Sequence, residues 1–170
     1  GEIRDSQTAR TAMQAAMTGH LVLSTVHAKD TLGAIVRLLD LEVKPSLLSS
    51  SLNLILAQRL VRRLCPACKA PSKLTSDQRV LMGDHSADIR RVYTPVGCPR
   101  CLDTGYRGRH ALFELLEIND TVRDLLHGSP GVADLRRSMQ ERSHVTLRDL
   151  GWQVVVNGQT DVDEVVHVTA

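Results

Sequence analysis

The sequence predicts an α/β fold with a metal-stabilised excursion and a group of small C-terminal helices, and three observations support this. Near the start of the chain, an apolar segment lies between two helical patterns, an order that is typical of α/β domains. The four cysteines all fall in two C-x-x-C pairs in the middle of the chain. The last third contains short helical patterns separated by glycines and capping residues, which favours a compact group of helices.

The composition is that of a globular protein, and it argues against two classes of function. Of the 170 residues, 42% are hydrophobic and 24% are charged, which provides enough apolar material for a buried core. The formal net charge is only +2, and one Trp, two Tyr and one Phe offer little surface for stacking bases, so we expect no nucleic-acid binding. No apolar run approaches the roughly 20 residues of a membrane span, so we expect no direct membrane insertion.

The first quarter of the chain predicts a helix, a strand and a second helix. Asp5 or Ser6 can cap the first helix, in which alanines and methionines recur at helical spacing, and Gly19 suits its end. Residues 20–27 have an apolar centre that does not alternate with charge, which predicts a strand buried on both faces. The second helix is expected from about Thr31, where leucine, isoleucine and valine share one face.

Two histidines lie at the ends of the expected strand. His27 follows its carboxyl end, and in open α/β sheets this end borders the ligand crevice. His20 lies at the opposite end, just after the first helix. The residues alone favour a core or helix-capping histidine at both positions, so spacing does not assign a ligand to either one.

The middle of the chain is expected to alternate between helix and strand. A strongly helical pattern after Pro45 continues to Leu64, and its basic end complements the helix dipole, so we expect this helix to deliver the first cysteine pair. Beyond it we expect a short helix, a short strand, a solvated turn rich in glycine and arginine, and a further strand with a helix as the alternative. These elements cover residues 77–82, 89–94, 105–109 and 111–118.

The remaining segments predict small helices with short connections. Glycines 128 and 158 are placed to end two of them, because glycine tolerates the backbone conformation that follows a helix. Such helices would pack as a compact cap on the α/β part. The expected ranges are 120–127, 132–142, 146–157 and 161–168, the last of them capped by Thr160.

The two cysteine pairs, Cys65-Pro66-Ala67-Cys68 and Cys98-Pro99-Arg100-Cys101, predict a single metal site. Each spacing lets two thiolates on one tight turn approach the same ion, and four thiolates form a closed tetrahedral site that suits Zn²⁺. Such a site is structural, because no coordination position stays open for catalysis. The alternatives are a disulfide scaffold and a redox C-x-x-C. However, 4 cysteines in 170 residues are not disulfide-dense, and a redox pair would leave the other pair unexplained.

Several motifs in the same order make the chain resemble the ATPases of type II secretion and type IV pilus assembly. The segment at 1–5, GEIRD, resembles the end of that family's Walker B motif. The segment at 18–31, TGHLVLSTVHAKDT, resembles its histidine box. Two further segments, LAQRLVRRLCPAC at 56–68 and GCPRC…GYRGRHALFELLEI at 97–118, resemble the family's tetracysteine subdomain and the strand that follows that subdomain. The resemblance covers nearly the whole chain and favours assembly-type members, since retraction-type members usually lack the four cysteines.

The resemblance implies roles for individual residues. Glu2 would be the Walker B acid, which orients water or helps to hold Mg²⁺ near the γ-phosphate of ATP, and Arg4 and Asp5 would orient Glu2. His20 and His27 occupy the family's two histidine positions, so they would sense the nucleotide phosphates. The ligands of a structural Zn²⁺ would be Cys65, Cys68, Cys98 and Cys101.

The resemblance also implies an order of domains. Residues 1–64 would form the distal part of a RecA-like P-loop ATPase core, 65–104 a tetracysteine zinc-binding subdomain, 105–118 a strand returning to the core, and 119–170 a helical C-terminal subdomain. The family's Walker A loop, which cradles the phosphates, has no match in these residues. We therefore expect that the 170 residues by themselves neither bind ATP tightly nor hydrolyse it.

By this resemblance the chain is expected to be the C-terminal part of a hexameric, cytoplasmic motor ATPase. Hydrolysis of ATP would drive the assembly of pilins or pseudopilins. Contact with the inner membrane would pass through partners, namely the platform and cytoplasmic components of a secretion or pilus machine. The alternative from another class is a non-enzymatic, zinc-stabilised module that mediates protein contacts.

Overall fold

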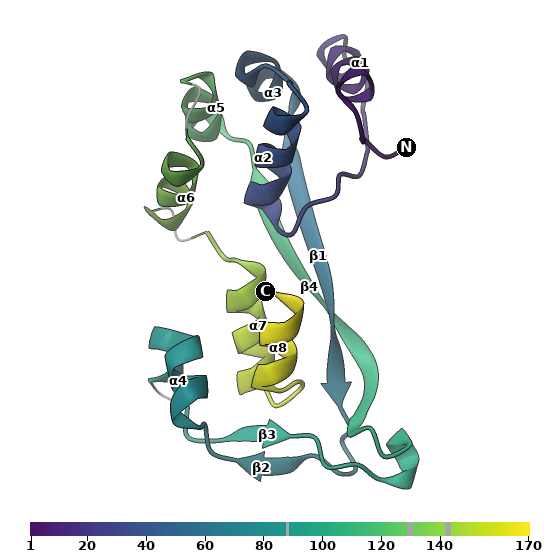
Figure 1. Ribbon diagram of the computed structural model, residues 1–170, viewed down its shortest axis with the longest axis vertical. Helices are drawn as coiled ribbons and strands as arrows, with labels where there is room; N and C mark the ends of the chain where they lie inside the picture. Colours follow the sequence, from purple (N-terminus) through teal and green to yellow (C-terminus); the bar gives the residue numbers. More distant parts are fainter. Residues whose placement is uncertain (88, 129–130, 142–143) are drawn as a thin grey trace. The chain divides into compact units, whose positions relative to one another are not determined.

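The contacts of the computed structural model group the chain into two compact units (Figure 1). The first unit comprises Gly1–Ala57 and Glu114–Val145, and the second comprises Gln58–Phe113 and Thr146–Ala170. The four-part division that the sequence suggests stays a prediction. The residues that the structure describes are 1–87, 89–128, 131–141 and 144–170.

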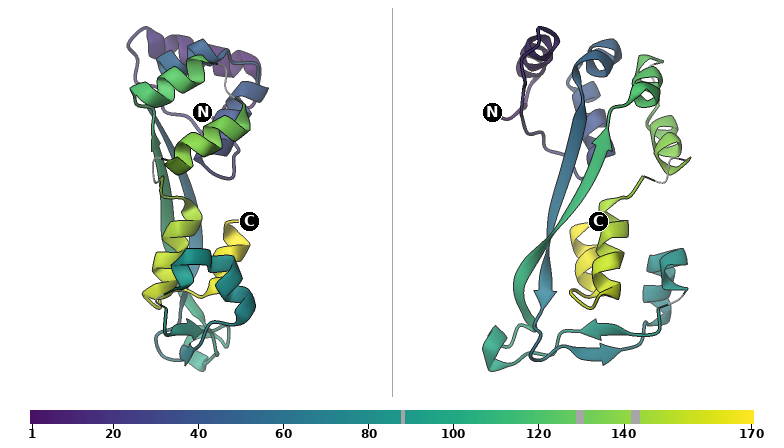
Figure 2. Two further views of the ribbon diagram at one scale, coloured as in Figure 1. Left: turned by 90° about the vertical axis from the view of Figure 1, so that its left-hand side faces the viewer. Right: turned by 180° about the vertical axis from the view of Figure 1, so that it is seen from behind.

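Two long strands contribute residues to both units. They are β1 (Leu54–Leu64) and β4 (Tyr106–Glu117), which pair in a two-stranded sheet. Their arrowheads point in opposite directions (Figure 2). Exposed positions alternate with partly buried ones along β1 up to Val61, and buried positions alternate with exposed ones along β4 from Leu112 onward. One side of each of these stretches is therefore packed.

Several helices of the first unit begin at a side chain that caps them. Asp5 accepts the backbone N–H of Thr8 at 2.8 Å, and Asp30 accepts that of Gly33 at 2.6 Å. These bonds satisfy amides that have no partner within the helix, which fixes where each helix starts. The helices are α1 (Ser6–Met17), α2 (Thr31–Asp40), α3 (Pro45–Ser51), α5 (Asp120–His127) and α6 (Val132–Glu141).

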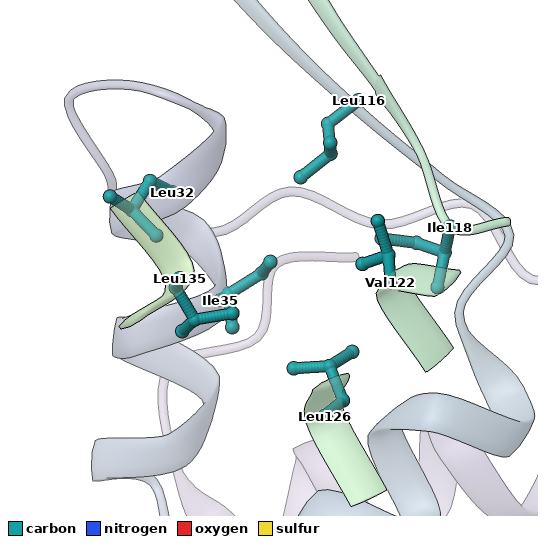
Figure 3. Close-up of a cluster of buried hydrophobic side chains, with 7 residues drawn as sticks. All are labelled: Leu32, Ile35, Leu116, Ile118, Val122, Leu126 and Leu135. Carbon is teal, nitrogen blue, oxygen red and sulfur yellow. The ribbon is translucent and has the colours of Figure 1, made fainter. Parts of the chain in front are cut away.

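Two apolar clusters hold the first unit together. One joins α2, α5 and α6 to the end of β4, and Figure 3 shows its side chains pointing toward one another. The other joins α1, α2 and α3. The first cluster contains Leu32, Ile35, Leu116, Ile118, Val122, Leu126 and Leu135, and the second contains Ile3, Ala9, Met13, Leu38, Val43 and Leu48.

The second unit packs two helices against short strands and a small helix. Strands β2 (Ala70–Ser72) and β3 (Val92–Thr94) pair antiparallel. Its apolar cluster centres on Trp152 and Val165. The remaining elements are α4 (Ser76–Met82), the 3₁₀ helices η1 (Gly83–Ser86) and η2 (Pro99–Cys101), α7 (Leu147–Val156) and α8 (Val162–Val168).

The prediction of a single helix from Pro45 to Leu64 is wrong. Helix α3 ends at Ser51, and residues 54–64 form β1. The apolar residues of this stretch fit both periods, and pairing with β4 decides in favour of the strand because it satisfies the backbone hydrogen-bonding groups. The first cysteine pair is therefore delivered by a strand and not by a helix.

The prediction of a strand buried on both faces at 20–27 is also wrong. Within the described residues, the pairing of this segment is one parallel bridge between Thr25 and Glu2. Leu21 and Leu23 are 86% and 81% exposed. An apolar run becomes a buried strand only where neighbouring strands and covering helices are in place, and the described residues supply a single bridge.

Smaller differences concern the ends of elements. Strand β4 already begins at Tyr106, so most of the expected turn at 105–109 belongs to the strand. The cap of α8 is Asp161, since Thr160 instead donates its hydroxyl to the carbonyl of Arg62 at 2.8 Å. Strand β3 is shorter than the expected 89–94. The expected helices at 77–82, 120–127, 132–142 and 146–157 are confirmed as α4, α5, α6 and α7 to within one residue at each end, with residue 142 outside the described residues.

Candidate functional site

The four predicted metal ligands lie together in the second unit. Their Sγ atoms are all within 4.8 Å of one another. The Sγ of Cys65 is 4.0 Å from that of Cys98, and the Sγ of Cys101 is 3.8 Å from those of Cys68 and Cys98. A tetrahedron with metal–sulfur bonds of roughly 2.3 Å has edges of about 3.8 Å. The spacing therefore fits one Zn²⁺, and all four cysteines are free of disulfides, whose S–S bond is about 2 Å.

The surroundings of the cysteines shift the pKa values of two thiols in opposite directions. Burial raises the pKa of Cys68 to about 11. Burial also acts against ionisation of Cys101, but the backbone N–H groups of Cys98 and Gly105 point at its Sγ and outweigh burial, which lowers the pKa of Cys101 to about 7. Both of these donors lie 3.3 Å from the sulfur. Amide donors of this kind stabilise the thiolate form that a metal requires.

Close packing of the loops around the second cysteine pair requires glycine at two positions. Gly97 has φ +112, and a Cβ there would lie 2.8 Å from the carbonyl oxygen of Asp103. Gly105 has φ +77, and its Cβ would lie 2.4 Å from the Cβ of Pro95. These glycines let the loop before the pair pack directly against the loop after it, which fixes the turn that presents Cys98 and Cys101.

The residue after the first pair ties the cysteine turn to the helices of the second unit. Lys69 donates from Nζ to the carbonyl of Gly158 at 2.6 Å and lies 4.5 Å from the ring centre of Tyr93. The backbone N–H of Cys65 donates to the carbonyl of Gly105 at 2.9 Å. The two cysteine turns are thus held by hydrogen bonds to each other and to the connection between α7 and α8.

A second group of predicted site residues meets in the first unit. The carboxylate of Glu2 contacts Arg4 Nη2 at 2.6 Å through Oε2 and His27 Nε2 at 2.8 Å through Oε1. The contact with His27 is a close approach and not an aligned hydrogen bond. Hydrogen bonding from Arg4 is the main cause that lowers the pKa of Glu2, so the carboxylate stays ionised. The side chain of His27 is 87% exposed.

The other two predicted site residues of the first unit take part in helix ends. The ring of His20 lies at the end of α1, where Nδ1 is 3.1 Å from the hydroxyl of Thr18 and 3.2 Å from the carbonyl of Ala15. Asp5 caps the start of α1, and its hydrogen bond from the Thr8 amide lowers its pKa. Within the described residues, the contacts of His20 and Asp5 are with residues of α1 and its end, whereas Glu2 contacts Arg4 and His27.

The sequence reasoning missed several buried carboxylates, among them Glu114 and Glu164. Glu114 of β4 is 2% exposed and accepts from Thr31, and Glu164 of α8 is 4% exposed and accepts from Arg62. For Glu114 a signal was present, because Leu112 and Leu116 stand two residues to either side, and alternate residues of a strand share one face. A glutamate between two core leucines predicts a buried charge with a dedicated partner.

A comparison with family models finds that residues 1–167 match the model described as type II/IV secretion system protein. The type II secretion system protein E of Aeromonas hydrophila is 47% identical over 99% of this chain, and the type IV pilus assembly ATPase PilB of Myxococcus xanthus is 42% identical over 100% of it. The matches cover 34% and 31% of those two proteins. The chain therefore spans about a third of the length of the curated relatives it matches.

Two solved structures have a similar fold. The ATPase DotB of Yersinia pseudotuberculosis is similar with a TM-score of 0.64 at 20% identity, over 99% of this chain and 35% of DotB. The pilus retraction motor PilT, solved with bound ADP, is similar with a TM-score of 0.66 at 21% identity, over 99% of this chain and 38% of PilT. These likenesses show that the chain shares the α/β fold of these two proteins. Among the described helices, none is both long and apolar enough to cross a bilayer.

Proposed function

Because the chain belongs to the family of type II/IV secretion system proteins, we propose that it is part of a motor ATPase that drives pilin or pseudopilin assembly. In the whole protein, ATP with Mg²⁺ is the substrate, and hydrolysis takes place at a site to which this chain contributes Glu2 and His27. The relatives named as a type II secretion protein E and as the pilus assembly ATPase PilB support this proposal.

The observation that carries the proposal is the contact between Glu2 and His27. These residues are 25 positions apart in the sequence, yet their side chains approach to 2.8 Å. The parallel bridge between Glu2 and Thr25 aligns the two segments, and Ile3 adds a backbone hydrogen bond to Thr25 at 2.8 Å. Phosphoryl transfer needs an ionised carboxylate that orients water or the metal, and an exposed imidazole beside it is able to contact phosphate.

The neighbouring residues have supporting roles in this proposal. Arg4 keeps Glu2 ionised and restricts its carboxylate. Asp5 orients the segment indirectly, since it starts α1 three residues after Glu2. His20 would sense nucleotide phosphates, as the resemblance implies, from its place at the end of α1.

The cysteine cluster of the second unit would hold a structural Zn²⁺. Cys65, Cys68, Cys98 and Cys101 supply four sulfurs at a spacing that fits the ion. Bound there, zinc would supply a crosslink between the two loops and no catalytic step, because four protein ligands close its coordination sphere. Its binding energy would then be folding energy of the second unit.

The whole protein is proposed to act as a homo-hexamer in the cytoplasm. The chain would supply the distal half of a RecA-like domain, the zinc subdomain and a helical C-terminal subdomain, divided at residues 64, 104 and 118. Platform and cytoplasmic components of a secretion or pilus machine would hold it at the inner membrane. The family membership and the α/β fold shared with DotB and PilT support this arrangement.

Release of phosphate from ATP by the full-length protein tests the proposal. We expect steady hydrolysis by the wild type and a loss of about 100-fold or more in Glu2→Gln, which keeps the shape of the side chain but removes its charge. Glu42→Gln is the matched control, because Glu42 is exposed and its carboxylate lies 3.6 Å from the guanidinium of Arg10. An inactive wild type, or full activity in Glu2→Gln, would contradict the proposal and favour the zinc-stabilised interaction module.

The 170-residue chain provides a second test. We expect it to release no phosphate above the background of its Glu2→Ala variant, since the phosphate-cradling loop is not among its motifs. Steady release that depends on Glu2 would show that these residues suffice for hydrolysis.

A further inference from the structure

Glu114 is a buried carboxylate that joins three elements of the first unit. It stands on β4, 2% exposed, with its Oε1 facing the first residue of α2. The backbone N–H of Thr31 donates to this oxygen at 3.0 Å, and the Thr31 hydroxyl donates to the same oxygen. Nε2 of His144, which follows α6, lies 3.3 Å away. Thr31 is fully buried, so both donors are shielded from water.

Burial of a carboxylate in such a place costs desolvation free energy that an apolar residue would not cost. The charge is tolerated only where its contacts offset this cost. The flanking positions Leu112 and Leu116 are core residues, so packing alone would favour leucine at 114. The N-terminus of α2 does offset the cost in part, since its amides and dipole favour a negative charge. The start of α2 thus provides a favourable environment for the charge of Glu114.

The start of α2 determines where the histidine-bearing loop ends. His27 is separated from Thr31 by three residues, and Asp30 among them accepts the amide of Gly33 at 2.6 Å. At its other end the loop is held at Thr25, whose carbonyl accepts the amide of Ile3 at 2.8 Å. Between these two anchors, the contact of the His27 side chain is with Glu2. The position of the imidazole therefore depends on both anchors.

We propose that Glu114 is a positioning residue, which sets the distance between His27 and Glu2 by fixing Thr31 at the start of α2. It touches neither of these two side chains in the structure and acts through Thr31. The inference rests on the proposed function, because it assigns Glu114 a role in the hydrolysis attributed to the Glu2 and His27 pair.

A pair of substitutions at Thr31 in the full-length protein tests this role. Thr31→Val keeps the shape and the backbone amide but removes the hydroxyl donor, whereas Thr31→Ser keeps the donor. We expect kcat for ATP hydrolysis to fall by about 10- to 100-fold in Thr31→Val, with KM within about twofold of the wild type, because misplacement of a reacting group by about 1 Å costs this much. Thr31→Ser should retain kcat to within about twofold.

Glu114→Gln provides the second variant, and Glu117→Gln on the same strand is its matched control, because Glu117 is exposed. Glu114→Gln should lower kcat as Thr31→Val does. It should also raise the hydrogen-exchange rate of amides at 27–33 about tenfold, since opening of the start of α2 becomes easier. Glu117→Gln should change neither quantity.

The possible outcomes separate this inference from the proposed function. An active wild type with unchanged kcat in folded Thr31→Val and Glu114→Gln would overturn the inference alone. An equal loss in Thr31→Ser and Thr31→Val would also overturn it, because the hydroxyl would then not matter. A wild type without ATPase activity would overturn the proposed function, and exchange at 27–33 would then decide whether Glu114 still fixes the loop.

Discussion

The two units of the molecule differ in how their candidate sites are held. In the second unit, four cysteines converge from two loops, and backbone amides, a lysine and two glycines fix those loops. In the first unit, Glu2 and His27 meet on a single parallel bridge, and the imidazole is 87% exposed. Substitution in the tightly packed cysteine site should therefore destabilise the fold. Substitution of Glu2 or His27, whose contact depends on one bridge, should instead reduce activity.

The largest effect is expected from breaking the cysteine site. Cys98→Ser removes one of four ligands, and a structural zinc site contributes roughly 10–16 kcal/mol of apparent binding energy to folding. We expect the bound zinc to fall from one per chain to near zero and the second unit to unfold at a much lower temperature, as measured by metal analysis and thermal unfolding. Leu102→Ala is a suitable control, because this neighbour of Cys101 is 86% exposed. Unchanged zinc content in Cys98→Ser would refute the four-sulfur site.

A smaller effect is expected at Glu164, which anchors α8 to β1. Its carboxylate accepts the amide of Arg62 at 2.8 Å and the Arg62 guanidinium at 2.8 and 2.5 Å. At neutral pH, Glu164→Gln should lower the free energy of unfolding by about 1.5–3 kcal/mol, the usual worth of hydrogen bonds to a charged group. Urea unfolding of the chain measures this. Exposed Asp163→Asn should stay within about 0.5 kcal/mol of the wild type.

The same pair predicts a dependence on pH. Burial opposes ionisation of Glu164, but hydrogen bonds from Arg62 outweigh it and lower the pKa of the carboxyl below its ordinary value of 4.5. A carboxyl with a lowered folded-state pKa stabilises the fold above its unfolded-state pKa, and this stabilisation is lost as pH falls through the folded-state value. The difference in stability between wild type and Glu164→Gln should therefore shrink below about pH 4.5. A difference that grows on acidification would contradict the assigned ion pair.

Two helical glycines allow the units to be compared by the same substitution. A Cβ at Gly151 of α7 would lie 2.4 Å from Cγ1 of buried Val165, so Gly151→Ala should destabilise by about 1–3 kcal/mol through overpacking. A Cβ at Gly33 of α2 would lie 3.1 Å from Oδ1 of the capping Asp30, and the gain in helix propensity of about 1 kcal/mol opposes this contact. Gly33→Ala should therefore be close to neutral. If urea unfolding showed the same loss of unfolding free energy in both variants, the two helices would be packed alike at these positions.

Local signals in the sequence were sufficient for most helices and for the cysteine cluster. Asp5 or Ser6 before a run of alanines and methionines predicted α1, which Asp5 caps, and the C-x-x-C spacing predicted that four sulfurs would converge. The sequence did not reveal β1, because its apolar residues suit a helix as well as a strand, and its partner β4 lies tens of residues away. For the same reason the apolar character of residues 20–27 predicts a buried strand whether or not neighbouring elements cover it, and in the structure Leu21 and Leu23 are exposed.

The candidate site of the first unit was less accessible to residue-level reasoning. The spacing of His27 favoured a core or capping histidine, and only the family resemblance gave both His27 and Glu2 a role at the nucleotide. The structure places their side chains 2.8 Å apart. Glu114 was missed because no motif contains it, although its place between Leu112 and Leu116 was visible. Contacts between distant segments depend on the packing of whole elements, which neither spacing nor composition encodes locally.

The smallest expected effect concerns Arg4, which modulates Glu2 without being needed for the fold. The side chain of Arg4 is 74% exposed, so solvent weakens its pairing and we expect no measurable loss of stability in Arg4→Ala. Its hydrogen bond nevertheless lowers the pKa of Glu2, and its removal should let that pKa rise. Glu2 would then become protonated at higher pH, so the acidic limb of the ATPase pH profile of the full-length protein should move upward. Arg10→Ala, which removes an exposed arginine paired with Glu42 at 3.6 Å, should leave the limb in place. A limb that stays in place in Arg4→Ala would mean that the ionisation of Glu2 does not control hydrolysis at low pH.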